Sequence, residues 1–293
     1  MQHNQRSRVT RLATADEFLS LTEQLRAADP FRTNLMGSVA SSVASGARTY
    51  ESYFWWILLD DLGAVVGAAI RTAPHGMILS PMAPALTQVL ATAVIKADVE
   101  LPGVAGSTSV VNAFVDAYTA ICGRDDTNLI RKVGRELLYA LGQLVIPDVQ
   151  GEMEVASQVD YETLSAWYID FGSEAGLLMP NPAASIADGF ARNSWRFWKV
   201  NNQVVSMAGH AALVEVPGGT VGRIGPVFTP KNQRRKGYAA ALTAHLAREL
   251  MEQGAQVMLY TDALNPTSNS VYQRIGFELI DENTRYEFCE PGC

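Results

Sequence analysis

The second half of the chain alternates between strand-like and helix-like spacing of its apolar residues. Three short apolar segments lie between residues 194 and 229, with the turn former Asn201-Asn202 between the first two. A helical pattern follows from Ala239 to Glu252, and then an apolar strand from Gln256 to Thr261. With a strand at 153–156, helices at 161–171 and 184–193, a short helix after residue 265 and a last strand at 284–288, the predicted order is strand, two helices, three antiparallel strands, helix, strand, helix and strand.

The first half repeats much of this order. Its predicted strands lie at 10–12, 53–59, 64–70, 77–79 and 135–141, and its predicted helices at 15–28, 31–43 and 84–97. The predicted fold class is α/β (α+β): a mixed, mostly antiparallel central sheet flanked by helices, present twice. We therefore predict two domains, at residues 1–145 and 152–293, joined by the polar Pro/Gly stretch at 146–151. An unrelated α/β domain in the first half is the alternative.

A basic turn that contains glycine, Gln233-Arg234-Arg235-Lys236-Gly237-Tyr238-Ala239, opens the helix that follows it. The first N–H groups of a helix and the positive end of its dipole attract anions together. Arginine can chelate phosphate oxygens, and glycine lets the backbone approach a phosphate because it has no Cβ. The form Arg-x-x-Gly-x-Ala differs from the phosphate loop of the nucleoside triphosphatases and from the dinucleotide loop Gly-x-Gly-x-x-Gly. The turn predicts an anion site, and a solvated basic turn is the alternative.

A second motif follows the strand at 256–261. It consists of Asn265-Pro266-Thr267-Ser268, then Tyr272, then Gly276-Phe277. Asn-Pro marks a turn, and Ser268 or Thr267 can cap the helix that follows and ends at Gly276. Alone, Asn265 is a turn former and Tyr272 a core aromatic, so the two motifs are informative only in combination.

In this order, over residues 221–288, the two motifs resemble the coenzyme A site of the GNAT superfamily of N-acetyltransferases. The resemblance implies acetyl-CoA as co-substrate and direct transfer of its acetyl group to an amine. It implies that Tyr272 is the general acid for the leaving thiolate, that Asn265 contacts the pantetheine arm, and that a main-chain N–H at Val227 or Phe228 polarises the thioester carbonyl. The implied acetyl-CoA-binding residues are Val227, Phe228, Thr229, Arg234, Arg235, Lys236, Gly237, Tyr238, Ala239, Ala240, Asn265 and Ser268.

The equivalent place in the first half has a different composition. The sequence there is Ser80-Pro81-Met82-Ala83-Pro84, without Arg, Lys or Gly. Its two prolines also lack N–H donors. We therefore expect one coenzyme A site per chain, with the first half as a scaffold or a wall of the acceptor site.

Composition and charge argue against several other classes of protein. The chain has 293 residues and a net charge of −7, with an isoelectric point near 5.2, which speaks against nonspecific nucleic-acid binding. No apolar run is long enough to span a membrane. The three cysteines and four histidines show no metal-ligand spacing, so no metal is expected. The N-terminal residues lead into no apolar signal-peptide core, so a cytoplasmic location is expected. The sequence is compatible with a homodimer but does not predict the oligomeric state.

The general base and the acceptor are also left open. The strand before the loop carries no carboxylate, so the candidate bases are Asp262, Glu215, His210, Glu174 or a water chain. Two other functions are alternatives. One is transfer of a longer acyl group or transfer to a hydroxyl, and the other is a non-catalytic acyl-CoA-binding regulatory domain.

Overall fold

The computed structural model describes residues 7–123, 130–177, 179, 181–217 and 219–289. The chain forms two compact units. Unit 1 consists of Met1–Glu136 with Asp281–Cys293, and unit 2 consists of Leu137–Ile280. Residues 1–6, considered above for a signal peptide, lie outside the described ones. The predicted domain borders at 145 and 152 stay a prediction.

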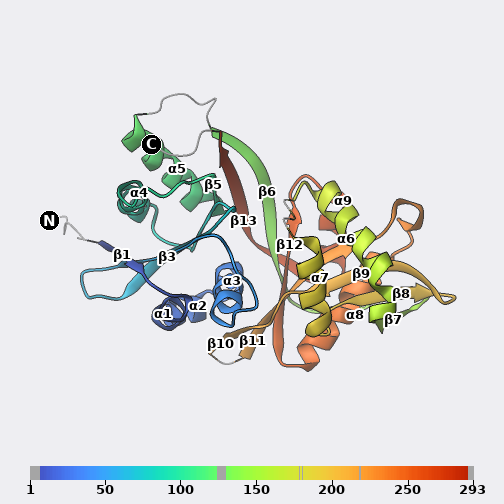
Figure 1. The fold of residues 1–293 in the computed structure, drawn as a ribbon. Coiled ribbons are helices and arrows are strands. Elements are labelled where there is room, and N and C mark those ends of the chain that lie inside the picture. The colour runs from blue at the N-terminus through green and yellow to red at the C-terminus, as the bar shows by residue number, and fades with distance from the viewer. Residues whose placement is uncertain (1–6, 124–129, 178, 180, 218, 290–293) are drawn as a thin grey trace. The chain divides into compact units, whose positions relative to one another are not determined.

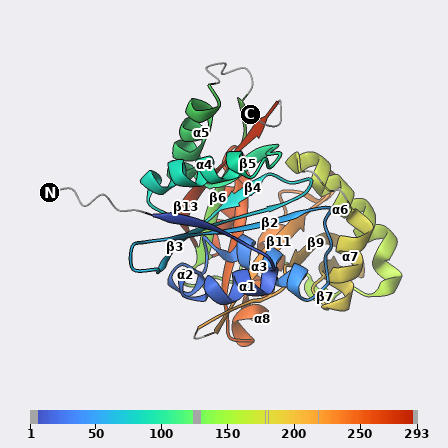
Figure 2. The ribbon, with the colours of Figure 1, turned by 60° about the vertical axis from the view of Figure 1, so that its left-hand side comes forward.

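Unit 1 has a mixed sheet with helices on both faces. Its strands, in spatial order, are β1 (Arg8–Leu12), β2 (Tyr53–Leu59), β3 (Val65–Thr72), β4 (Met77–Leu79), β5 (Gly103–Ser107), residues 281–288 of β13 (Phe277–Phe288) and residues 130–136 of β6 (Ile130–Leu141). Figure 2 shows α1 (Ala15–Leu21), α2 (Glu23–Ala28) and α3 (Asn34–Ala44) below strands β2 and β3, with α4 (Thr87–Lys96) and α5 (Thr108–Cys122) above them. Trp55 packs in the core on the first side and Trp56 in the core on the second, as the alternation of side chains along a strand requires.

Unit 2 repeats this arrangement. Its strands, in spatial order, are β7 (Glu152–Val155), β8 (Arg196–Val200), β9 (Gln203–His210), β11 (Gly219–Phe228), β12 (Ala255–Asp262), residues 137–141 of β6 and residues 277–280 of β13. The short β10 (Val214–Val216) pairs with β11. The helices of this unit are α6 (Tyr161–Ala175), α7 (Pro182–Ala191), α8 (Tyr238–Glu252) and α9 (Pro266–Arg274) (Figure 1). Apolar side chains of α6 and α7 pack with Phe197 and Met207, whereas those of α8 pack with Trp198 and Ala208 from the same two strands.

In both units, the strand beside the fifth strand comes from a distant part of the chain. In unit 1 it is residues 281–288, which pair with β5 from Asn283–Ser107 to Glu287–Gly103. The Thr108 hydroxyl also donates to the Glu282 carbonyl at 2.8 Å, although the two residues are 174 positions apart in the chain. In unit 2 the strand is residues 137–141. The predicted fold class, a mixed and mostly antiparallel sheet flanked by helices, is confirmed, and the strand order of the two units is the same.

Most predicted elements are confirmed, with differences in their limits. Asn201 and Asn202 form the predicted hairpin turn with φ of 49° and 62°. The helix predicted at 15–28 is two helices that meet at Thr22, whose hydroxyl donates to the Phe18 carbonyl at 2.6 Å. Such a side-chain bond competes with regular helix bonding. The final strand begins seven residues earlier than predicted, at Phe277 rather than 284.

Candidate active site

The basic turn at residues 231–240 leads into a helix whose first N–H groups are free. Lys231–Gln233 is a 3-10 turn, and α8 begins at Tyr238 without a side-chain cap. The first bond at this end of the helix runs from the Ala241 N–H to the Gly237 carbonyl at 3.0 Å. The N–H groups of Tyr238, Ala239 and Ala240 therefore have no partner among the described residues. Three such donors at the positive end of a helix are suited to an anion.

Gly237 is required at this turn for two reasons. Its φ is +85°, which residues with a Cβ rarely adopt, and a Cβ built there would lie 2.9 Å from Cγ2 of Val149. The sequence suggested instead that the missing Cβ makes room for a phosphate. The structure shows that the space which the Cβ would occupy faces Val149.

The cations of the turn differ in what they contact. Arg234 donates from Nε to the Thr229 carbonyl at 2.8 Å and from Nη2 to Oε2 of Glu174 at 2.6 Å. Lys236 donates to the side-chain oxygen of Gln233 at 2.9 Å. Arg235 is exposed and has a φ of 65°. Arg234 therefore connects the end of α6 to the end of β11, whereas Arg235 and Lys236 lie at the surface of the turn.

Strands β11 and β12 are paired over only part of their length. Their parallel register runs from Thr220–Ala255 to Ile224–Leu259. Beyond that pair, β11 shifts register against β9 and continues with Val227 opposite Ala208 and Phe228 opposite Met207. Val227, Phe228 and Thr229 thus form the stretch of β11 that leads away from β12 into the basic turn.

Ser206 fixes the end of β11. Its hydroxyl donates to the Phe228 carbonyl at 2.9 Å and lies 2.8 Å from the Thr229 hydroxyl. The Phe228 carbonyl is therefore already bonded within the protein. This bond uses the carbonyl of Phe228 and not its N–H, so both N–H groups that the resemblance assigned to the thioester carbonyl, those of Val227 and Phe228, keep that assignment as a prediction.

The second motif forms the turn before α9 and the helix itself. The Asn265 side chain caps α9, and its Oδ1 accepts from the Ser268 N–H at 3.1 Å. The prediction that Ser268 or Thr267 caps this helix is wrong. Asparagine is a favoured N-cap and proline a favoured first helical residue, so the helix begins two or three residues earlier than a cap at Thr267 or Ser268 would allow.

Tyr272 lies on the buried face of α9. Its side chain is 9% exposed, and it belongs to the same core cluster as Ile224 and Leu259, the last pair between β11 and β12. Its ring meets Phe277 edge-on, with the ring centres 6.2 Å apart. Burial raises the pKa of the Tyr272 hydroxyl to about 12. The hydroxyl is therefore protonated at neutral pH and is able to donate a proton.

The sequence did not identify the residues of β6 and of the segment after it that contact α9 and its C-terminal end. Tyr139 of β6 is almost fully buried in the same cluster, and its hydroxyl accepts from Nε2 of Gln273 at 3.3 Å. The Gly142 N–H donates to the Gly276 carbonyl at 2.9 Å, and the Val145 N–H donates to the Ile275 carbonyl at 3.0 Å. More than 130 positions separate Tyr139 from Gln273, and no local pattern in the sequence signals such a contact.

The candidate bases are distributed over unit 2. Glu174 is paired with Arg234, and Oδ1 of Asp262 accepts from the Leu264 N–H at 2.8 Å. Glu215 is exposed on β10. Nδ1 of His210 lies 2.8 Å from the Ala211 carbonyl, and burial lowers the pKa of this imidazole. His210 is therefore mainly neutral at pH 7.

His210 also lines a pocket of about 410 Å³. The other residues that line it are Arg192, Asn193, Arg196, Ala212, Leu213, Glu249 and Gln253. Arg196 is 4% exposed and forms a two-pronged ion pair with Glu249. Glu249 and Gln253 lie at the C-terminal end of α8. Because α8 has 15 residues, this end is roughly 22 Å from the basic turn at its start. The pocket is therefore separate from the candidate phosphate site.

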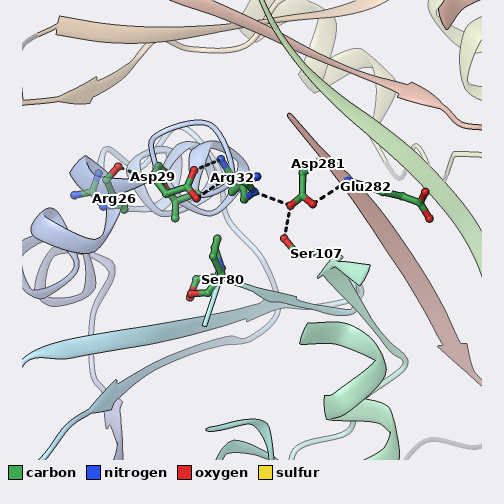
Figure 3. Close-up of polar contacts among 9 residues, drawn as sticks. Arg26, Asp29, Arg32, Ser80, Ser107, Asp281 and Glu282 are labelled. Atoms are coloured by element: carbon green, nitrogen blue, oxygen red, sulfur yellow. Dashed lines mark hydrogen bonds and ion pairs between the residues drawn. The ribbon is translucent and has the colours of Figure 1, made fainter. Parts of the chain in front are cut away.

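The corresponding strand ends of unit 1 are occupied by contacts within the protein. Ser80 follows β4; its hydroxyl accepts from the Ala68 N–H at 2.8 Å and donates to the Pro81 carbonyl at 3.0 Å. At the end of β5, Oδ2 of Asp281 accepts from the Ser107 hydroxyl at 2.5 Å and from Nε of Arg32 at 2.8 Å (Figure 3). A 3-10 turn that begins with Pro84 precedes α4. The arrangement found at residues 231–240 is not repeated here.

Within the described ranges, no three His, Cys, Asp or Glu side chains come together as metal ligands. None of the helices described above is both long enough and apolar enough to cross a bilayer.

A family model matches part of unit 2 and the strand that leaves it. Residues 207–286 match the model of the FR47-like protein family. This range includes most of the proposed site, from Val227 through the basic turn to Tyr272. No curated protein sequence is similar enough to this chain to count as a relative.

Several solved structures share the fold over nearly the whole chain. A GCN5-related N-acetyltransferase from Sphaerobacter thermophilus has a TM-score of 0.63 and 14% identity, over 98% of this chain and 97% of that one. A GNAT-family acetyltransferase from Colwellia psychrerythraea has a TM-score of 0.58 and 14% identity, over 96% and 99%. A tandem GNAT protein from the clavulanic acid biosynthesis pathway has a TM-score of 0.54 and 12% identity, over 98% and 100%. The resemblance inferred from the sequence is thus confirmed: residues 207–286 match the FR47-like family, and the chain as a whole has the fold of the GNAT N-acetyltransferases.

Proposed function

We propose that unit 2 binds acetyl-CoA and transfers its acetyl group to an amine. The observation that supports this most strongly is that three features meet in one core cluster. Ile224 and Leu259 mark where β11 and β12 part, Tyr238 opens the helix after the basic turn, and Tyr272 carries the buried hydroxyl. A transferase of this fold that uses a thioester needs three parts: a phosphate site, a strand end that is not paired with its parallel neighbour, and a proton donor.

The basic turn is the proposed site for the pyrophosphate. The free N–H groups of Tyr238, Ala239 and Ala240 would donate to phosphate oxygens, and Arg235 and Lys236 would add positive charge. Along the part of β11 that is not paired with β12, the backbone of Val227 would bond the pantetheine arm. Asn265 is exposed at the start of α9, and its side-chain nitrogen remains available beyond the capping bond.

Tyr272 is the proposed general acid. Acetyl-CoA supplies an acetyl group already activated as a thioester. When the amine nitrogen bonds to the acetyl carbon and the carbon–sulfur bond breaks, Tyr272 gives its proton to the departing sulfur. The ammonium proton leaves to a base or to water. A hydroxyl whose pKa is about 12 stays protonated at neutral pH, so Tyr272 is able to act as a donor but not as the base.

Turnover of acetyl-CoA against a panel of primary amines, measured by release of free thiol, tests this proposal. Tyr272→Phe keeps the ring and its packing on Phe277, so acetyl-CoA binding and melting temperature should be nearly unchanged. Turnover should fall by up to about 10²–10⁴-fold, toward the low end because a coenzyme A thiolate is already a fair leaving group. Full turnover by Tyr272→Phe would remove this residue from the mechanism. Tight binding of acetyl-CoA without turnover on any amine would favour a regulatory acyl-CoA-binding role.

A further inference from the structure

Arg71 of unit 1 is a buried cation with almost no partners. It lies on β3 and is 5% exposed. Nη1 donates to the Ser52 hydroxyl at 3.2 Å, and Nε is buried with no partner among the described residues. No carboxylate of the described residues lies within ion-pair distance of it. A guanidinium has five N–H donors, and burying its charge without acceptors is costly.

Arg11 shares an aromatic neighbour with Arg71. The guanidinium carbons of Arg11 and Arg71 lie 4.6 and 5.8 Å from the centre of the Phe54 ring. Arg71 is opposite Phe54, and Arg11 is opposite Trp56, two residues further along β2. Directly paired residues project from the same face of a sheet, so both arginines lie on one face with the Phe54 ring.

His75 indicates a third cation beside this group. Burial lowers the pKa of its imidazole, and the positive charges of Arg48 and Arg71 lower it further. The acidic group that acts on Arg71 is Glu100, which is exposed and attracts the guanidinium without bonding to it. Arg71 is thus accompanied by Arg11 at the Phe54 ring and by Arg48 near His75, and one exposed carboxylate acts on it, which leaves an excess of positive charge around a guanidinium with free donors.

We propose that Arg11, Ser52 and Arg71 form a binding site on unit 1 for the phosphate group of a small phosphorylated molecule. The planar guanidinium of Arg71 presents paired N–H donors that match phosphate oxygens, and the bound dianion would neutralise the excess charge. This site differs from the basic turn at 231–240, which belongs to unit 2. It is also not the unit 1 counterpart of that turn. Arg71 pairs with Met77 at the start of β4, whereas the counterpart begins at Ser80, after the end of β4.

Thermal unfolding with inorganic phosphate as the probe tests the site. Arg71→Met retains much of the apolar stem and removes the charge. The melting temperature of the wild type should rise with phosphate concentration, because a ligand that binds only the folded state stabilises it. Arg71→Met should respond less than the wild type, because only the basic turn of unit 2 is left to bind phosphate. In phosphate-free buffer it should melt no lower than the wild type, because an unneutralised buried charge has been removed.

Arg235→Ala is the matched control for the basic turn of unit 2. It should keep the part of the phosphate response that Arg71→Met loses, because it leaves the proposed site of unit 1 intact. A response that disappears in Arg235→Ala and persists in Arg71→Met would overturn the proposal, as would a wild type that does not respond. Glu100→Gln removes the competing carboxylate and should tighten phosphate binding by about two- to five-fold, as expected for one exposed charge interaction.

A second measurement uses the wild type alone and does not depend on the folding of a variant. A bound phosphate would offset the field of Arg48 and Arg71, so the pKa of His75 should rise with added phosphate in an NMR titration of the imidazole signals. His210 in unit 2 serves as the internal control and should not move, because its pocket lies at the far end of α8 from the basic turn. An unchanged His75 would overturn the site. An equal shift with the same concentration of acetate would overturn its assignment to phosphate.

Discussion

Replacing Gly237 by alanine separates the conformational role of this residue from its role in binding. Gly237 has φ of +85°, and Gly254, just after α8, has φ of +82°. Alanine at either position should cost about 1–2 kcal/mol of stability, because an L residue is strained in left-handed backbone. A Cβ at 254 would meet nothing within 4 Å, whereas a Cβ at 237 would lie 2.9 Å from Val149. Gly237→Ala should therefore lose the same stability or more.

The two variants should differ most in acetyl-CoA binding. To relieve the contact with Val149, the turn must shift, and the shift moves the free N–H groups of Tyr238, Ala239 and Ala240. Loss of one well-placed charged hydrogen bond is worth about 1.5–3 kcal/mol, which corresponds to a dissociation constant raised by roughly ten-fold or more. Gly254→Ala should leave the dissociation constant unchanged.

Calorimetric titration with acetyl-CoA and urea unfolding of both variants measure these effects. Val149→Ala, combined with Gly237→Ala, should restore part of the stability, because it makes room for the new Cβ. Equal dissociation constants for Gly237→Ala and Gly254→Ala would refute the assignment of this turn to phosphate binding. One bound acetyl-CoA per chain is the expected stoichiometry.

Three further predictions concern residues near the proposed site. Tyr272 has a pKa of about 12 in the folded protein against about 10 when unfolded. The stability that depends on its protonated hydroxyl is fully present below pH ~10 and is lost as the pH rises to ~12. Between these pH values, urea unfolding should show that the wild type loses up to about 2.7 kcal/mol more stability than Tyr272→Phe does. Asn265→Ala and Asn181→Ala each remove an Asn-Pro helix cap and should each lose about 1 kcal/mol in urea unfolding, but only Asn265→Ala should raise the KM for acetyl-CoA. Glu174→Gln frees Arg234 from its exposed ion pair and should change stability by less than about 1 kcal/mol. Calorimetry should show that Glu174→Gln binds acetyl-CoA more tightly than the wild type does, and that Arg234→Ala binds it more weakly.

Much of unit 2 could be predicted because its elements are defined by local patterns. Helix α8 has a clear apolar face, and Asn201-Asn202 adopts the turn that its sequence favours. In unit 1, β5 and α5 were not assigned. Gly103 and Gly106 weaken the strand signal, and the β-branched residues of α5 have low helix propensity.

The site was predicted as far as its motifs are contiguous. The loop and Tyr272 each belong to a recognisable short segment, so their roles could be inferred. Val149 at Gly237, Tyr139 at Gln273 and Glu174 at Arg234 are contacts between distant parts of the chain. A single sequence contains no periodicity or spacing that records such pairs, and only the folded structure reveals them.

The placement of residues 281–288 in unit 1 has a consequence for biosynthesis. Residues 1–136 emerge from the ribosome first. The sheet of unit 1 nevertheless stays incomplete until Asp281–Phe288 has been made, because these residues pair with β5. Unit 2 is one continuous stretch, Leu137–Ile280, and can close earlier. This reverses the usual order in which the N-terminal domain folds first. During that interval the nascent chain exposes an unpaired edge at Gly103–Ser107, the kind of edge on which strands of other chains add. A premature stop just before Asp281 would therefore spare unit 2 and leave a truncated product that tends to aggregate through unit 1.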